Sequence, residues 1–141
     1  MLTRRGFASC AICAATGFAA TEAWAQGAPP PAGSGVKRTT FAQMDGPMPG
    51  YVTINMELEI DAGVTIPRHT HPGIESSYVL EGGIELPVEG QPTRIFKAGD
   101  GFLIPPETPH GGGKPSDKKY RVAITYVVEK GKPLMSPAPA S

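Results

Sequence analysis

Apolar and polar residues alternate strictly along residues 51–60. The apolar positions are Val52, Ile54, Met56, Leu58 and Ile60, and the residues between them are Thr53, Asn55, Glu57 and Glu59. Side chains of a β-strand point to opposite faces in turn, so this segment would present one apolar and one polar face. The pattern therefore predicts a half-buried strand whose apolar face belongs to a hydrophobic core.

Five shorter apolar or alternating runs follow this segment. They cover residues 76–80, 84–88, 93–96, 101–104 and 120–128. Turn-forming sequences rich in Gly, Pro and Asp separate them. The same part of the chain contains neither an internal repeat nor an amphipathic segment of helix length. Short, evenly spaced strands of this kind predict an all-β sandwich or barrel.

Length and charge limit the classes of function. The chain has 141 residues, which is enough for one modest domain. It carries 13 Lys and Arg against 13 Asp and Glu, with neither a basic patch nor an acidic tail. Phosphate binding would require a clear excess of basic residues. Nucleic acid is therefore not an expected partner.

Residues 1–25 have the features of a twin-arginine signal peptide. Arg4 and Arg5 precede a weakly apolar run over residues 8–20 that is too short to span a bilayer permanently. A small-x-small cleavage site follows at Ala23–Ala25. An N-terminal helix or membrane anchor is the alternative interpretation. We expect cleavage after this site, a periplasmic protein, and no stable membrane anchor in the mature chain.

The predicted cleavage removes both cysteines, Cys10 and Cys13. The mature chain would then have neither a disulfide nor a thiolate ligand, so a metal site would use imidazole and carboxylate groups. Removal of the signal leaves 11 basic and 12 acidic residues. Residues 26–36 are predicted to be a Pro- and Gly-rich linker, residues 37–132 the folded domain, and residues 133–141 a flexible tail.

The chain has only three histidines, and they are candidates for metal binding. His69 and His71 are separated by one residue, so on an extended segment both point to the same face and can hold one ion. A Pro-Gly turn follows, and we expect it to bend the chain so that the carboxylate of Glu75 swings back toward them. His110 would complete the site. The alternative for any single histidine is an ordinary hydrogen-bonded residue.

Two motifs give the chain a resemblance to the cupin superfamily. The first, G-x5-H-x-H-x3-E-x6-G, covers residues 63–82, and the second, G-x5-P-x4-H, covers residues 99–110. The first has every Gly, His and Glu of the family pattern. In the second, Glu107 stands where the family has glycine, and Lys114 where it often has asparagine. A glutamate in the backbone conformation that suits glycine would be strained by about 1 to 3 kcal/mol. Both residues would contact the His110 region if they point inward and would be solvated turn residues if not.

The resemblance implies a cupin-type jelly-roll barrel of antiparallel strands that holds one divalent metal ion on His69, His71, Glu75 and His110. Four protein ligands would leave one or two coordination positions open for water, dioxygen or a substrate. Raw affinity favours copper or zinc over manganese or iron. The twin-arginine route resembles one that exports folded proteins. A protein that folds in the cytoplasm around manganese or iron would keep that ion, although it binds more weakly than copper or zinc. Manganese or iron is therefore favoured, with zinc, nickel and copper left open.

The resemblance also implies a small-molecule substrate. We expect a metal-dependent enzyme, dioxygenase-like, that acts on a small enolic or aromatic compound, with Glu75 tuning the charge of the ion or acting as a base. Two other functions stay open. One is a non-catalytic protein that senses or stores a metal or small ligand, and the other is a lyase or isomerase that uses the ion as a Lewis acid. Relatives of this size often pair through edge strands, so a homodimer is expected and a monomer stays open.

Other residues near the motifs have two interpretations each. Arg68 and Arg94 could bind a substrate carboxylate or face solvent. Tyr78 is expected in the core rather than in catalysis. The run Gly111–Gly113 follows His110 directly, and we expect a flexible loop there rather than a dedicated substrate cleft.

Overall fold

The computed structural model describes residues 35–139. The predicted signal peptide, both cysteines and nearly all of the predicted linker lie outside them. The described residues form strands and contain no helix long and apolar enough to cross a membrane. The strands are β1 Val36–Asp45, β2 Tyr51–Ile60, β3 His69–Thr70, β4 Gly73–Glu81, β5 Gly83–Leu86, β6 Arg94–Lys97, β7 Gly101–Ile104, β8 Tyr120–Glu129 and β9 Ser136–Pro137.

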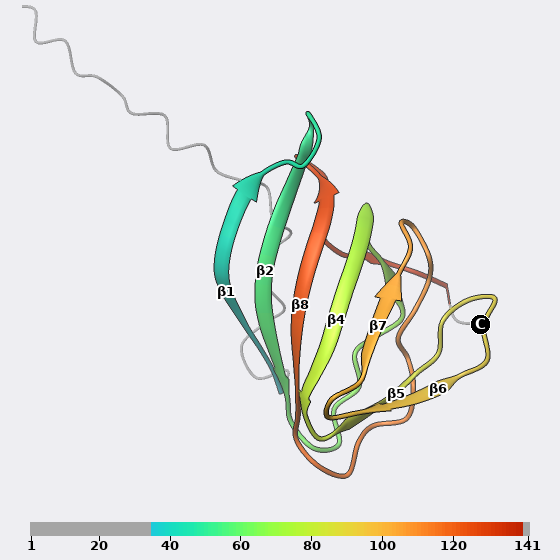
Figure 1. Cartoon of the computed structure of the whole chain (residues 1–141). Coiled ribbons are helices and arrows are strands. Elements are labelled where there is room, and N and C mark those ends of the chain that lie inside the picture. Colours follow the sequence, from blue (N-terminus) through green and yellow to red (C-terminus); the bar gives the residue numbers. More distant parts are fainter. Residues whose placement is uncertain (1–34, 140–141) are drawn as a thin grey trace, which may run out of the picture.

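One five-stranded antiparallel sheet forms the main wall of the fold. Its strand order is β1-β2-β8-β4-β7. Two small antiparallel pairs, β5 with β6 and β3 with β9, complete the fold. Figure 1 shows the five strands side by side, with the β5–β6 pair beyond β7. The prediction of an all-β fold of antiparallel strands is confirmed.

The strict alternation along β2 and β8 explains the main core. The two strands pair over their whole length, from Tyr51 opposite Glu129 to Ile60 opposite Tyr120. Every second residue of each strand therefore lies on the same inner face of the sheet. That face is buried and includes Ile54, which is only 2% exposed. A second, smaller cluster joins β4 and β7 to the β5–β6 pair through Val79, Leu86, Val88, Phe96 and Ile104.

The first strand was not predicted from the sequence. β1 lies where we placed the end of the linker and the start of the domain, and its pairing with β2 is interrupted by a bulge at Phe41. An irregular edge strand gives no regular alternation, so its pattern was hidden. Both β2 and β8 lie inside the sheet, and the edges are β1 and β7. Pairing of two copies therefore does not need to cover β2 or β8, and the homodimer stays a prediction that light scattering would check.

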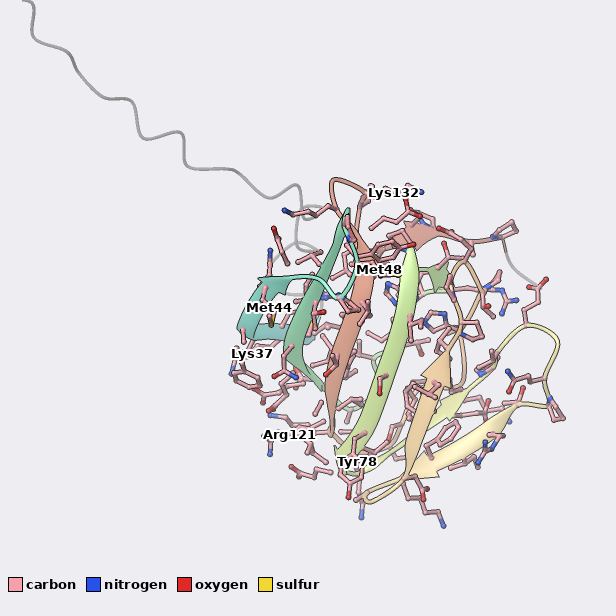
Figure 2. The ribbon with its side chains drawn as sticks, turned by 45° about the horizontal axis from the view of Figure 1, so that its top comes forward. Lys37, Met44, Met48, Tyr78, Arg121 and Lys132 are labelled. Carbon is pink, nitrogen blue, oxygen red and sulfur yellow. The ribbon has the colours of Figure 1, made fainter. Side chains whose placement is uncertain are left out.

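Tyr78 was expected in the core, and this expectation is wrong. Its side chain lies on the outer face of β4 and is 50% exposed. Figure 2 shows it near Arg121, which lies on the neighbouring strand β8. The inner positions of β4 are Glu75, Ser77 and Val79, so a residue one position away must face outward.

Glu107 takes the conformation that glycine would favour. Its φ is 55°, and among the described residues no other non-glycine residue has a positive φ. The backbone N–H of Glu107 donates to the carbonyl oxygen of His71 at 2.9 Å. The strained turn thus ties the second motif to the first. The side chain itself is exposed, so Glu107 does not point into the interior.

We expect Glu107→Gly to raise the free energy of unfolding by up to about 1 kcal/mol, because the relief of backbone strain exceeds the entropic cost of glycine. Urea denaturation measures the change. Glu107→Ala keeps a Cβ in the same conformation, so it should give no such gain. A glycine variant less stable than the alanine variant would contradict the strain argument.

Candidate metal centre

Backbone pairing brings the two motifs together. The N–H of His69 donates to the carbonyl oxygen of His110 at 2.9 Å, and the N–H of His110 donates to the carbonyl oxygen of His69 at 3.0 Å. This isolated antiparallel bridge joins β3 to the loop that follows β7. Two histidines 41 positions apart in the sequence are therefore held side by side.

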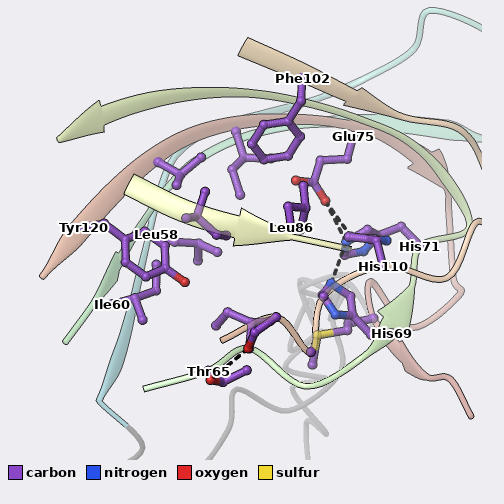
Figure 3. A pocket seen from close by; sticks show the side chains of 18 of the residues that line it. Leu58, Ile60, Thr65, His69, His71, Glu75, Leu86, Phe102, His110 and Tyr120 are labelled. Carbon is purple, nitrogen blue, oxygen red and sulfur yellow. Dashed lines mark hydrogen bonds and ion pairs between the residues drawn. The ribbon is translucent and has the colours of Figure 1, made fainter. Parts of the chain in front are cut away.

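The four predicted residues meet at one point of the interior. The Nε2 atoms of His69 and His71 are 3.1 Å apart. An oxygen of Glu75, Oε2, lies 2.9 Å from Nε2 of His71 and 3.3 Å from Nε2 of His110. All four side chains are buried, and their potential ligand atoms lie within 4.8 Å of one another. Figure 3 shows the Glu75 carboxylate pointing at the histidine rings.

Glu75 reaches the site by a different route from the one we predicted. It is not carried back by a turn, because it lies within β4, opposite Ile104 of β7 and Tyr126 of β8. The alternation of β4 alone directs its side chain inward, together with that of Ser77. The Ser77 hydroxyl donates to Oε1 of Glu75 at 2.6 Å, which leaves Oε2 facing the histidines.

Each imidazole contacts a main-chain carbonyl oxygen through its Nδ1 atom. The distances are 2.7 Å from His69 to Pro67, 2.5 Å from His71 to Leu134, and 2.9 Å from His110 to Thr108. A carbonyl oxygen can only accept, so Nδ1 carries the proton in all three rings. In a neutral ring, Nε2 then presents its lone pair to the centre of the site, whereas in a protonated ring of His71 or His110 it can donate to the Glu75 carboxylate. Such a carbonyl partner fixes both the tautomer and the direction of a metal-binding histidine.

The C-terminal segment belongs to the site. Leu134 supplies the acceptor for His71, and β9 pairs with β3 through Pro137 opposite His69. From the sequence we expected a flexible tail over residues 133–141, and these contacts were not predicted. Nothing in the sequence PLMSPAPAS indicated these contacts, because it shows no alternation of apolar and polar residues and has no side chain typical of a metal ligand.

Burial and mutual contact shift the titration of the site. Burial and, to a lesser extent, the neighbouring His110 together lower the pKa of His69 to about 4. His69 is therefore neutral at pH 7. Burial alone would raise the pKa of the Glu75 carboxyl, but hydrogen bonds and charge from His110 and His71 outweigh it and hold that pKa well below its usual range. The site thus combines an ionised carboxylate with a neutral imidazole.

This donor set fits one divalent metal ion. With Nδ1 protonated in both rings, the lone pairs of His69 and His71 face each other at 3.1 Å and repel unless a cation or a proton lies between them. Imidazole nitrogen and carboxylate oxygen are ligands that suit manganese, iron, nickel, copper and zinc alike. The chemistry of the four groups therefore supports a metal centre and leaves the identity of the metal open.

Ser77→Ala is expected to weaken metal binding by about 10- to 100-fold, the usual effect of losing a partner that orients a ligand. The carboxylate of Glu75 would lose the 2.6 Å hydrogen bond that aims it at the histidines. Competition with a fluorescent chelator measures the affinity. Ser76→Ala is the matched control, because Ser76 faces outward on the same strand. Equal affinities for the two variants would contradict this role of Ser77.

A cavity of about 80 Å³ opens beside the cluster of His69, His71, Glu75 and His110, the candidate metal centre. Its remaining walls are mostly apolar and come from β2 and β8, from Phe102 on β7 and from Gly111–Gly113. The glycine run is not a loose loop. A Cβ on Gly113 would lie 2.1 Å from the carbonyl oxygen of Glu85, so the run packs against β5 and shapes the cavity wall.

The two arginines proposed for substrate binding lie elsewhere. Arg68 pairs with Glu89 in an ion pair, and the Arg94 guanidinium lies over the ring of Phe96 at 4.6 Å from its centroid. Neither lines the cavity at the metal centre. Lys114 does line it, and its side chain is largely exposed.

Other cavity residues were missed from the sequence. Tyr126 lies opposite Glu75 on β8, and its ring centroid is 4.7 Å from that of His71. Tyr120 and Tyr126 both occupy inward positions of a segment that we predicted to be a strand, so the period of two could have identified them. Arg38 gave no such signal, because β1 itself was not predicted.

Comparison with known proteins agrees with this fold. A family model described as Cupin domain matches residues 56–129, more than half of the chain, and this match includes all four residues of the site. No curated protein sequence matches the chain.

Solved structures share the fold. An RmlC-like cupin from Shewanella frigidimarina is 26% identical with a TM-score of 0.56, and the match covers 69% of this chain and 79% of that one. The polyketide cyclase RemF from Streptomyces resistomycificus is 21% identical with a TM-score of 0.59, over 76% of this chain and 73% of that one. The DMSP lyase DddQ from Ruegeria pomeroyi is 27% identical with a TM-score of 0.49, over 52% of this chain and only 37% of that one. The activities of these proteins belong to their own sites.

Proposed function

The chain belongs to the cupin family, and from this premise we propose that it is a metal-dependent enzyme acting on a small organic substrate, with dioxygenase-like oxidation as the leading reaction. The observation that carries the proposal is the position of the four ligand residues. They form one wall of a cavity whose other walls are mostly apolar. A purely structural metal site is closed by its ligands and does not need to adjoin a space for a substrate.

The residues of the site would have different roles. His69, His71 and His110 would hold the ion through Nε2, since their Nδ1 atoms are engaged by carbonyl oxygens. When bound, a divalent ion would supply Lewis acidity and, if it is manganese or iron, redox chemistry toward dioxygen.

Glu75 would act as the fourth ligand or, if it leaves the ion, as a base. Its pKa is held well below the usual range while it contacts the histidines. Its carboxylate lies within 3.3 Å of Nε2 of both His71 and His110, so the ligand role is favoured in this arrangement. The apolar cavity walls would exclude water and select an aromatic or enolic substrate body.

Oxygen uptake by the full chain tests the proposal. The protein is loaded with manganese(II) or iron(II) and assayed with a panel of flavonols and small organic acids, in air and without air. We expect a substrate-dependent uptake that the His69→Ala variant lacks. Turnover that proceeds equally without air would replace this reaction with a lyase or isomerase. Tight metal binding without turnover of any compound would indicate a protein that senses or stores its ligand.

We also propose export by the twin-arginine route, on the basis of the sequence of residues 1–25. Folding before export would explain how the site takes manganese or iron in place of the tighter-binding copper or zinc. Metal analysis of protein isolated from the periplasm checks both points. A preparation that contains only zinc or copper would count against cytoplasmic loading.

A further inference from the structure

The cavity at the metal centre also contains an arginine that has no ion-pair or hydrogen-bond partner among the described residues; it interacts electrostatically with the Tyr126 side chain in the cavity. Arg38 of β1 lies opposite Leu58 of β2, half-buried and on the inner side of the sheet, where both residues line the cavity. Within residues 35–139, its guanidinium forms no ion pair and no hydrogen bond. The other arginines of this part of the chain all have partners: Arg68 pairs with Glu89, Arg94 lies over Phe96, and Arg121 pairs with Glu57.

A half-buried guanidinium without a counter-ion is unfavourable. Burial lowers the pKa of Arg38, yet an arginine remains charged at any physiological pH. Partly desolvated charges in proteins are normally compensated by an opposite charge or a ligand. Placed in a cavity beside a metal centre, Arg38 is suited to an anionic group of the substrate.

Two tyrosine hydroxyls in the same cavity also lack a hydrogen-bond partner among the described residues. Tyr120 and Tyr126 line the cavity, and neither hydroxyl forms a hydrogen bond with another described residue. The described part of the chain has no fully buried side-chain polar atom without a partner, so these hydroxyls open into the cavity. Burial raises the pKa of Tyr120 to about 12, so it remains a donor. In Figure 3, Tyr120 lies with Leu58 and Ile60 at the side of the cavity away from the histidines.

The remaining charges near the cavity nearly cancel. Glu85 and Lys114 both line it, and the backbone N–H of Lys114 donates to Oε1 of Glu85 at 3.3 Å. Their charges, one carboxylate and one ammonium, cancel. Apart from the charges of the metal centre itself, Arg38 is then the uncompensated cation of the cavity. A single guanidinium matches one carboxylate in bidentate geometry. A phosphate ester carries more negative charge than one guanidinium compensates.

We propose that Arg38 binds the carboxylate of a substrate that is a monocarboxylic acid with an apolar, aromatic or branched body, so that the opposite end of the molecule reaches the metal centre. The proposal rests on the proposed function, because it assigns a substrate class to the same site. The apolar side chains between the two polar ends, among them Met56 and Leu58, would contact the body of the acid. Arg38 is then a residue that determines specificity, and it does not take part in holding the ion.

Binding of an acid and its uncharged analogue tests this. The full chain, loaded with one metal ion, is titrated by calorimetry with benzoate and with benzamide. We expect benzoate to bind at least about 10-fold more tightly than benzamide, the value of one charge-assisted hydrogen-bonded pair. Arg38→Met should abolish the preference, Arg38→Lys should keep part of it, and Arg94→Met should leave it unchanged. Circular dichroism and metal content verify that the variants are folded and loaded.

Three other results of this titration would decide between the proposal and its alternatives. Equal affinity for the two compounds in the wild-type protein would overturn the proposal. A preference that survives Arg38→Met but is lost in His110→Ala would overturn it too, since the carboxylate would then bind the ion instead. A preference that depends on Arg38, found in a protein that turns over no substrate, would keep this inference and refute the proposed enzyme.

Discussion

Replacing His110 by alanine is expected to lower the metal affinity of the protein by more than about 100-fold, beyond the loss typical of a residue that only orients a ligand. The change removes one of four groups that converge within 4.8 Å, and it removes a partner of the Glu75 carboxylate at 3.3 Å. The backbone bridge between residues 69 and 110 uses only main-chain atoms, so it should survive. After dialysis against dilute metal, mass spectrometry should find about one ion per wild-type chain and almost none per variant chain.

The same change should abolish stabilisation by metal. A ligand that binds only the folded state raises its stability by about 2.7 kcal/mol when present at 100 times its dissociation constant. We therefore expect the melting temperature of the wild-type protein, and not that of His110→Ala, to rise on addition of metal. Lys114→Ala is the control, because Lys114 lines the cavity but is no candidate ligand. Full metal retention by His110→Ala would refute the assigned role of His110.

Gly73→Ala should cause a large loss of stability. A Cβ at this position would lie 2.1 Å from the carbonyl oxygen of Val127 and 2.6 Å from the Cα of Val128, both main-chain atoms of β8. Strands β4 and β8 would have to separate, and overpacking against backbone costs about 3 kcal/mol or more. Because Glu75 lies two residues further along β4, metal affinity should fall as well.

Urea denaturation and metal titration check this prediction together. Ile74→Ala is the matched control, since Ile74 is the next residue of β4 and its side chain is 46% exposed. It should cost less than about 1 kcal/mol and leave metal binding intact. A Gly73→Ala protein as stable as Ile74→Ala would show that β4 does not need this close approach.

Gly73 also shows that the four residues can meet as expected although the local argument for Glu75 was wrong. The sequence suggested a bend at Pro72 and Gly73 that would carry Glu75 back to the histidines. In the structure Gly73 is the first residue of β4, where the absence of a side chain lets β4 approach β8, and strand alternation directs Glu75 inward. The cluster of four residues could be predicted from the two motifs, because each motif keeps its residues at fixed local spacing.

Contacts between distant segments could not be predicted in this way. The carbonyl oxygen of Leu134 contacts His71, 63 positions earlier, and no local pattern near Leu134 indicates it. Arg38 lies on an edge strand whose bulge hides its alternation. The long strands β2 and β8 were predicted with nearly the correct bounds, because their alternation is a local consequence of one buried face.

The central claim is that His69, His71, Glu75 and His110 hold one metal ion together. Anomalous diffraction from crystals of the full chain loaded with manganese or zinc tests it most directly. We expect one peak per chain, about 2.0 to 2.2 Å from Nε2 of each histidine and from a carboxylate oxygen of Glu75, as in known nitrogen- and oxygen-ligated sites. A peak elsewhere, or none at this point in fully loaded crystals, would contradict it.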